Sequence, residues 1–74
     1  MTPDKMIHMA NQIGTFMATQ AGDDAYSGVG GVAHHIRRFW EPRMRNQLFA
    51  HLDAGGAGLH PIVIAAAERV RAMA

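Results

Sequence analysis

The sequence predicts an all-α fold, a small single domain (residues 1–74) in which three to four short helices pack as a compact bundle. Apolar residues recur at three- and four-residue spacing along most of the chain, as they do on the buried face of a helix. Proline stands where helices can begin, and glycine-rich stretches separate the periodic segments. No segment alternates apolar and polar residues with the period of two that marks a strand. We expect helices at about residues 3–20, 29–40, 42–54 and 61–73.

The first predicted helix carries recognisable signals at both ends. Thr2 is a good N-cap, Pro3 suits the first helical position, and Asp4 suits the positive end of the helix dipole. Gly22 is the expected C-cap. Because a helix turns by about 100° per residue, six apolar residues of this segment fall within an arc of about 120° and form a core-facing stripe. They are Met6, Met9, Ala10, Ile13, Phe16 and Met17.

The second and third predicted helices meet at a proline. Pro42 disfavours helical geometry at Glu41 and suits the start of a helix, so we expect a break between the two helices there. Phe39 and Trp40 end the second helix on its apolar side. That side is formed by Val29, Val32, Ala33, Ile36, Phe39 and Trp40. One side of the third helix carries Met44, Leu48 and Leu52.

The fourth predicted helix begins at Pro61, and three apolar residues elsewhere do not fit the stripes. The apolar face of this helix consists of Ile62, Val63, Ala66, Ala67, Val70 and Met73. Ile7, Phe49 and Ile64 fall outside the main arcs of their helices. Together with six methionines, which adapt to irregular binding faces, they indicate a second buried surface. The alternative is that the helices cross steeply and the core has two sides.

Length and composition favour a partner. A chain of 74 residues buries only about 60% of the surface that its unfolded form exposes, so its core is marginal. Without cysteine it has no disulfide and no thiolate site for zinc or an iron–sulfur cluster. The lack of cysteine is compatible with a reducing cytoplasm. No apolar run reaches the ~20 residues of a membrane span, and the first residues do not read as a secretory signal, so we expect a cytoplasmic protein without a membrane partner.

Candidate catalytic and metal-binding residues are few. Helical metal pairs need a spacing of three or four residues, and none of the five histidines has such a partner. His34 and His35 point about 100° apart on a helix. The histidines are His8, His34, His35, His51 and His60. We interpret them as solvated or capping residues, and the carboxylates show no acid–base pair, so we expect no catalytic and no metal site. A small metal-dependent enzyme is a third option, and it requires a stoichiometric metal.

The stretch from Arg37 to Arg45 combines four arginines with the only tryptophan. Arginine and tryptophan around a buried anchor are typical of protein–protein interfaces. The same residues can bind nucleic acid, with arginines on phosphates and rings on bases, but the net charge of +1 makes the chain a weak attractor for it. A third interpretation is a solvated charged face with both aromatic rings in the core.

Three blocks of the sequence carry a family resemblance. They are Pro3-Asp4-Lys5-Met6-Ile7-His8-Met9-Ala10-Asn11-Gln12-Ile13, His35-Ile36-Arg37-Arg38-Phe39-Trp40-Glu41-Pro42-Arg43-Met44-Arg45, and Gly55-Gly56-Ala57-Gly58-Leu59 with Pro61. In this order, and over nearly the whole chain, they resemble the delta subunit of NAD-dependent formate dehydrogenase. The stretch from Asp23 to Gly31 contributes little to the resemblance.

This resemblance implies a small cytoplasmic polypeptide that binds no cofactor itself and belongs to a soluble complex oxidising formate to carbon dioxide and reducing NAD. It places the chemistry in larger subunits, on a molybdenum or tungsten bis-pterin guanine dinucleotide centre, iron–sulfur clusters and FMN. The implied partner is the large (alpha) catalytic subunit, in a complex that also holds beta and gamma subunits. The family offers no catalytic residues to carry over.

Our hypothesis from the sequence is therefore a non-catalytic accessory subunit that docks on the large subunit and supports its assembly, stability or molybdenum-cofactor insertion. Arg37, Arg43 and Arg45 are expected to present charge to that partner. The predicted partner-binding residues are Arg37, Phe39, Trp40, Pro42, Arg43, Met44, Arg45 and Phe49. The alternative is a free-standing helical module that binds nucleic acid through Arg37–Arg45.

Overall fold

Four helices follow one another along the computed structural model, which describes residues 2–19 and 28–73. They are α1 (Pro3–Ala18), α2 (Gly28–Phe39), α3 (Pro42–Asp53) and α4 (Pro61–Met73). The described part of the chain contains no strand. The predicted all-α class is therefore confirmed.

The helices α1, α3 and α4 begin where the capping residue Thr2 and the prolines predict. The Thr2 hydroxyl accepts a hydrogen bond from the Lys5 N–H at 3.3 Å and caps α1. Pro42 and Pro61 are the first residues of α3 and α4. Glu41 has extended geometry, with φ −67° and ψ 152°, as expected for a residue before proline. These starts depend on short-range sterics, which a sequence displays directly.

The helix ends differ slightly from expectation. α1 ends at Ala18 with Thr19 as its C-cap, so it is shorter than the predicted 3–20, and Gly22 lies outside the described residues. α2 runs from Gly28 to Phe39. Trp40 lies just beyond it, although its N–H still donates to the Ile36 carbonyl at 3.1 Å. α3 ends at Asp53, one residue before the expected end.

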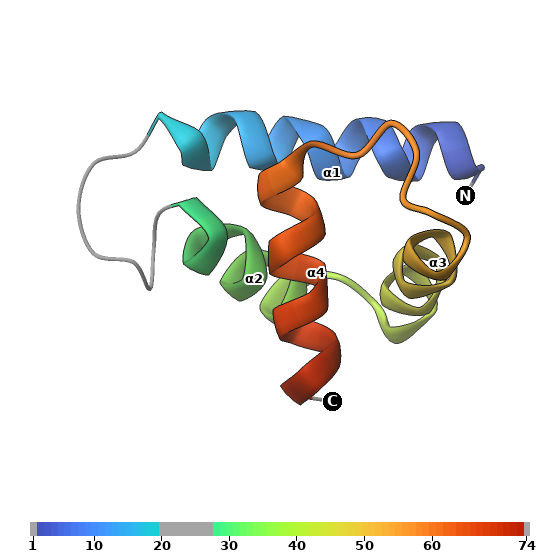
Figure 1. Ribbon diagram of the computed structural model, residues 1–74. Coiled ribbons are helices and arrows are strands. Elements are labelled where there is room, and N and C mark those ends of the chain that lie inside the picture. Colours follow the sequence, from blue (N-terminus) through green and yellow to red (C-terminus); the bar gives the residue numbers. More distant parts are fainter. Residues whose placement is uncertain (1, 20–27, 74) are drawn as a thin grey trace.

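Figure 1 shows how the helices are arranged. α1 lies along the top of the view, α2 and α3 lie beneath it, and α4 runs across the direction of α1. The most extensive contact is between α4 and α2, and the next is between α1 and α2. The connection between α3 and α4, residues 54–60, runs along α1 before α4 begins. The steep crossing of α1 and α4 gives the core more than one side.

All four helices contribute to one core. The largest fully buried side chains are Met6, Val32, Ile36, Leu48 and Val63. Trp40 and Leu59, which lie between helices, are 5% and 7% exposed. Ile7, Phe49 and Ile64 are partly buried and pack against this core. The two-sided core therefore accounts for these three residues, and the second buried surface predicted from them is not required.

Four large residues of the predicted stripes are exposed, contrary to expectation. Phe39 is 65% exposed, Phe16 is 59% exposed, Met73 is 49% exposed and Met9 is 37% exposed. On α1 the buried face is shifted toward Ala10 and Gly14, because α4 packs there, and Phe16 is left at the far edge of the stripe. Phe39 lies about 60° from Ile36 around α2, at the edge of the buried face and at the last helical residue. The periodicity located the stripes but not their buried edges.

Candidate functional site

The turn from α2 into α3 forms a corner that is stabilised by a buried side chain and by hydrogen bonds between the two helices. The Trp40 side chain is 5% exposed and belongs to the core. The Nη1 atom of Arg45, in the first turns of α3, donates to the Trp40 carbonyl at 2.8 Å and to the Arg37 carbonyl at 3.1 Å. These carbonyls lie at the C-terminal end of α2, where a positive charge interacts favourably with the negative end of the helix dipole. Arg45 therefore fixes the angle between α2 and α3.

The outside of the same corner exposes an aromatic ring. Phe39 is 65% exposed, whereas its neighbour Trp40 is buried. The His35 ring lies 4.9 Å from the Phe39 ring centroid at a tilt of 43°, and Arg38 Cζ lies 6.0 Å from that centroid. Both contacts are within the range of attractive aromatic and cation–π geometry. The Phe39 ring is thus positioned by its own helix while most of the side chain stays exposed to solvent.

A shallow groove continues from Phe39 onto α3. Its lining residues are Phe39, Glu41, Arg43, Met44 and Gln47. Arg43 is exposed, and Met44 is half-buried against the core. Protein interfaces are often anchored by exposed aromatic rings, adaptable methionines and arginines. Phe39, Met44 and Arg43 provide these three side-chain types on one fixed corner. We call this surface, Phe39 with Glu41, Arg43, Met44 and Gln47, the corner groove.

The predicted partner-binding residues are divided among four places. Phe39, Arg43 and Met44 line the corner groove, with exposed Pro42 between them in the chain. Trp40 and Arg45 hold the corner from inside. Phe49 lies at the junction of α3 and α4, where Arg71 Cζ is 5.8 Å from its ring centroid. Arg37 lies with Arg45 in a separate hollow lined by Arg37, Arg45, Val70 and Met73.

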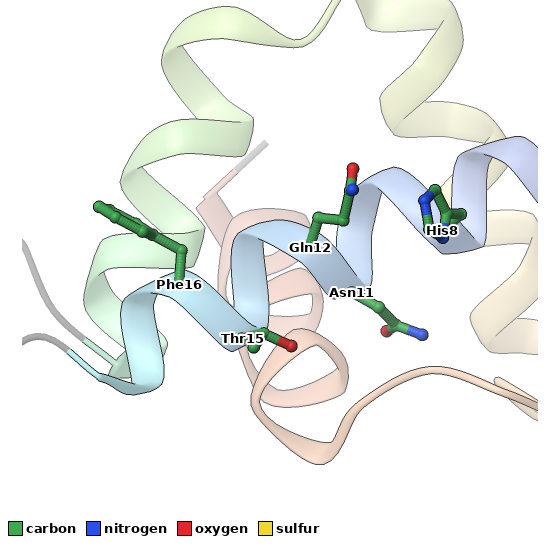
Figure 2. Close-up of a pocket in the computed structure, with 5 residues that line it drawn as sticks. All are labelled: His8, Asn11, Gln12, Thr15 and Phe16. Atoms are coloured by element: carbon green, nitrogen blue, oxygen red, sulfur yellow. The ribbon is translucent and has the colours of Figure 1, made fainter.

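A second feature, on α1, was not found by the sequence reasoning. Figure 2 shows a pocket lined by His8, Asn11, Gln12, Thr15 and Phe16. Within it, Asn11 points toward the connection before α4. Its Nδ2 donates to the Gly58 carbonyl at 2.8 Å, and its Oδ1 accepts from the His60 N–H at 2.8 Å. The sequence signal available for Asn11 was its position in the Pro3 to Ile13 block, which carries part of the family resemblance.

Two histidines have structural partners in the backbone. His60 Nδ1 accepts from the Ile62 N–H at 3.2 Å at the start of α4, and His51 Nε2 lies 2.7 Å from the Ala57 carbonyl. Within residues 2–19 and 28–73, no three histidine, aspartate or glutamate side chains lie close enough to hold a metal ion together. Among the described helices, none has the length and apolar character to cross a bilayer.

Charge is distributed unevenly over the described surface. Asp53 and Arg71 form an ion pair in which Nη1 and Nη2 lie 2.6 and 2.8 Å from the two carboxylate oxygens. The hydrogen bonds from Arg71, together with its charge, lower the pKa of Asp53 below the ordinary value. This is the only ion pair among residues 2–19 and 28–73. The arginines of the α2–α3 corner therefore lack a carboxylate partner within that part of the chain.

The fold and the corner groove define a class of protein: a small helical chain that exposes an aromatic ring on a fixed turn, beside arginines that no carboxylate of the described residues pairs with. The particular family follows from comparison with known proteins. The model of the NADH-dependent formate dehydrogenase delta subunit family, FdsD, matches residues 5–67, and the chain belongs to this family. Membership implies partner subunits in a multisubunit, cofactor-containing complex. No curated protein and no solved structure was found to match the chain.

Proposed function

We propose that this chain is the non-catalytic delta subunit of an NAD-dependent formate dehydrogenase and docks on the large catalytic subunit through the corner groove. The observation that carries this proposal is the 65% exposed Phe39 beside Arg43 on a turn fixed by Arg45. Docking supports assembly or stability of the large subunit, or insertion of its molybdenum cofactor. The proposed contact residues are Phe39, Arg43 and Met44 of the corner groove, together with the adjacent Pro42.

Folding energetics support a docking role. The chain has 74 residues and no disulfide. A domain of this size has a marginal core, so burying further apolar surface against a partner stabilises it. Phe39 and Phe16 are large apolar side chains that the fold leaves exposed. Covering an aromatic side chain at an interface is worth about 1.5–3 kcal/mol of transfer free energy.

The family assignment supports the choice of partner. In the proposed complex the large subunits carry the molybdenum or tungsten bis-pterin centre, the iron–sulfur clusters and FMN, and they react with formate and NAD. The delta chain binds none of these groups in this proposal, and the complex is cytoplasmic. Its contribution is a surface rather than a reacting group.

The test is charge reversal of a side chain that has no partner within the described structure. Arg43→Glu keeps a helix-compatible residue on the exposed side of α3, so we expect the helical circular dichroism to be unchanged while co-purification with the large subunit falls at least about tenfold, or ~1.4 kcal/mol. Arg69→Glu, on the exposed side of α4, is the matched control and should co-purify at the wild-type yield. Wild-type yield for Arg43→Glu would count against docking through the corner groove.

A further inference from the structure

A small hollow lies where the C-terminal ends of α2 and α4 meet α3, apart from the corner groove. Its walls are Arg37, Arg45, Val70 and Met73. Arg37 Nη1 lies 3.7 Å from the Met73 sulfur, which is a weak acceptor. Arg45 Nη1 is bound by the Arg37 and Trp40 carbonyls. Two guanidinium groups from two helices therefore face one hollow that has an apolar wall.

Within residues 2–19 and 28–73, no carboxylate compensates these two cations. The ion pair of the described residues joins Asp53 and Arg71. Arg45 uses one nitrogen on backbone carbonyls, which holds its planar group in place while further N–H donors stay available. Two like charges beside one hollow repel each other, and an anion between them removes that repulsion. The hollow therefore favours the binding of a negatively charged group.

We propose that Arg37 and Arg45 together bind a carboxylate carried on a short apolar stem. Guanidinium groups match a carboxylate with paired, charge-assisted hydrogen bonds, which are about twice as strong as neutral ones. Val70 and Met73 provide the apolar wall against which the stem packs. Such a group is either an aspartate or glutamate side chain of a partner subunit or a free small carboxylic acid. The first source rests on the proposed docking function, and the second does not.

The first experiment titrates the full chain with sodium propionate at constant ionic strength, with sodium chloride as the reference anion. Amide and arginine side-chain resonances are followed by NMR. We expect saturable shifts at Val70 and Met73, weakened at least about tenfold in Arg37→Gln and unchanged in Arg69→Gln. Arg37→Lys should weaken binding too, because an ammonium group keeps the charge but loses the planar pair of donors. Arg37 is preferred to Arg45 for substitution because Arg45 also caps α2.

The second experiment measures co-purification of the same variants with the large subunit. If Arg37→Gln weakens both propionate binding and co-purification, the ligand is a carboxylate of the partner subunit. If it weakens propionate binding alone, the ligand is a free carboxylic acid. A wild-type chain with a dispersed spectrum but no saturable response, or an equal response in Arg37→Gln, overturns the proposal. Should the isolated chain lack a dispersed spectrum, co-purification decides alone, and equal yields of Arg37→Gln and Arg69→Gln overturn it.

The two proposals fail in different ways. A wild-type chain that does not co-purify with the large subunit at all contradicts the docking function, but the propionate titration still decides whether the arginine hollow binds a carboxylate. Conversely, loss of the propionate response leaves the Arg43→Glu test of the corner groove intact.

Discussion

The side chain of Asn11 is hydrogen-bonded to the backbone N–H of His60, 49 residues later in the chain, at 2.8 Å. The same amide donates to the Gly58 carbonyl, also at 2.8 Å, so one side chain of α1 binds the connection to α4 on both sides of Leu59. Leu59 is 7% exposed and belongs to the core. Asn11 therefore determines where α4 begins relative to α1.

We predict that Asn11→Ala lowers the free energy of unfolding by about 1–3 kcal/mol, because the His60 N–H loses its acceptor and Gly58 loses its donor. Gln12→Ala is the matched control. Gln12 is exposed on the same helix, and its substitution should change stability by less than about 0.5 kcal/mol. Urea unfolding of the full chain gives both values. Equal stability of the two variants would show that solvent replaces the Asn11 contacts.

Gly14, one turn further along α1, lies against the same part of α4. A Cβ atom at position 14 would lie 2.8 Å from Val63 Cγ2, closer than packed atoms approach. We predict that Gly14→Ala is net destabilising, because overpacking costs about 1–3 kcal/mol whereas alanine gains only about 1 kcal/mol of helix propensity. In a Val63→Ala background the clash is absent, so the same change should become neutral or stabilising. A double-mutant cycle from thermal unfolding measures this coupling.

Phe39 and Trp40 are adjacent aromatic residues with opposite environments, 65% and 5% exposed. We predict that Trp40→Ala lowers stability by about 3–5 kcal/mol, which is enough to unfold a small domain. Phe39→Ala should change stability by less than about 0.5 kcal/mol while reducing co-purification with the large subunit. Circular dichroism reports the fold of both variants, and the fluorescence of Trp40, the only tryptophan, also reports the fold of Phe39→Ala. Unfolding of both variants would contradict this division.

The sequence predicted what depends on neighbouring residues. The helix starts at Pro3, Pro42 and Pro61 follow from local sterics. Periodicity placed Trp40 on the apolar side of its helix but did not decide between the core, where it lies, and a partner surface. The exposure of Phe39 could not be predicted, because the buried edge of a helix depends on where the other helices pack. The three-dimensional arrangement also determines the role of Arg45.

Arg45 is predicted from the sequence to present charge to a partner, and the structure adds that its Nη1 donates to the carbonyls of Arg37 and Trp40. Whether a side chain at the start of one helix reaches the end of the preceding one depends on the angle between them. Asn11 and His60 are a stronger example, because their hydrogen bond spans 49 positions and has no local signature. The Arg37–Arg45 hollow required both the corner and the last turn of α4 to be in place.

The Asp53–Arg71 pair leads to a prediction about pH. The hydrogen bonds and charge of Arg71 hold the pKa of Asp53 below its ordinary value of 3.8, so the carboxylate is favoured in the folded state. The stabilisation from the pair is present above that ordinary value and is lost as the pH falls through the lower folded-state value. We predict that Asp53→Asn lowers Tm slightly at pH 7, because the pair is exposed, and that the difference from the wild type shrinks as the pH falls below 3.8 and in 1 M salt. Glu68→Gln, on the exposed side of α4, is the control. A Tm difference that persists unchanged at pH 3 would mean that the asparagine acts through packing and not through the lost charge.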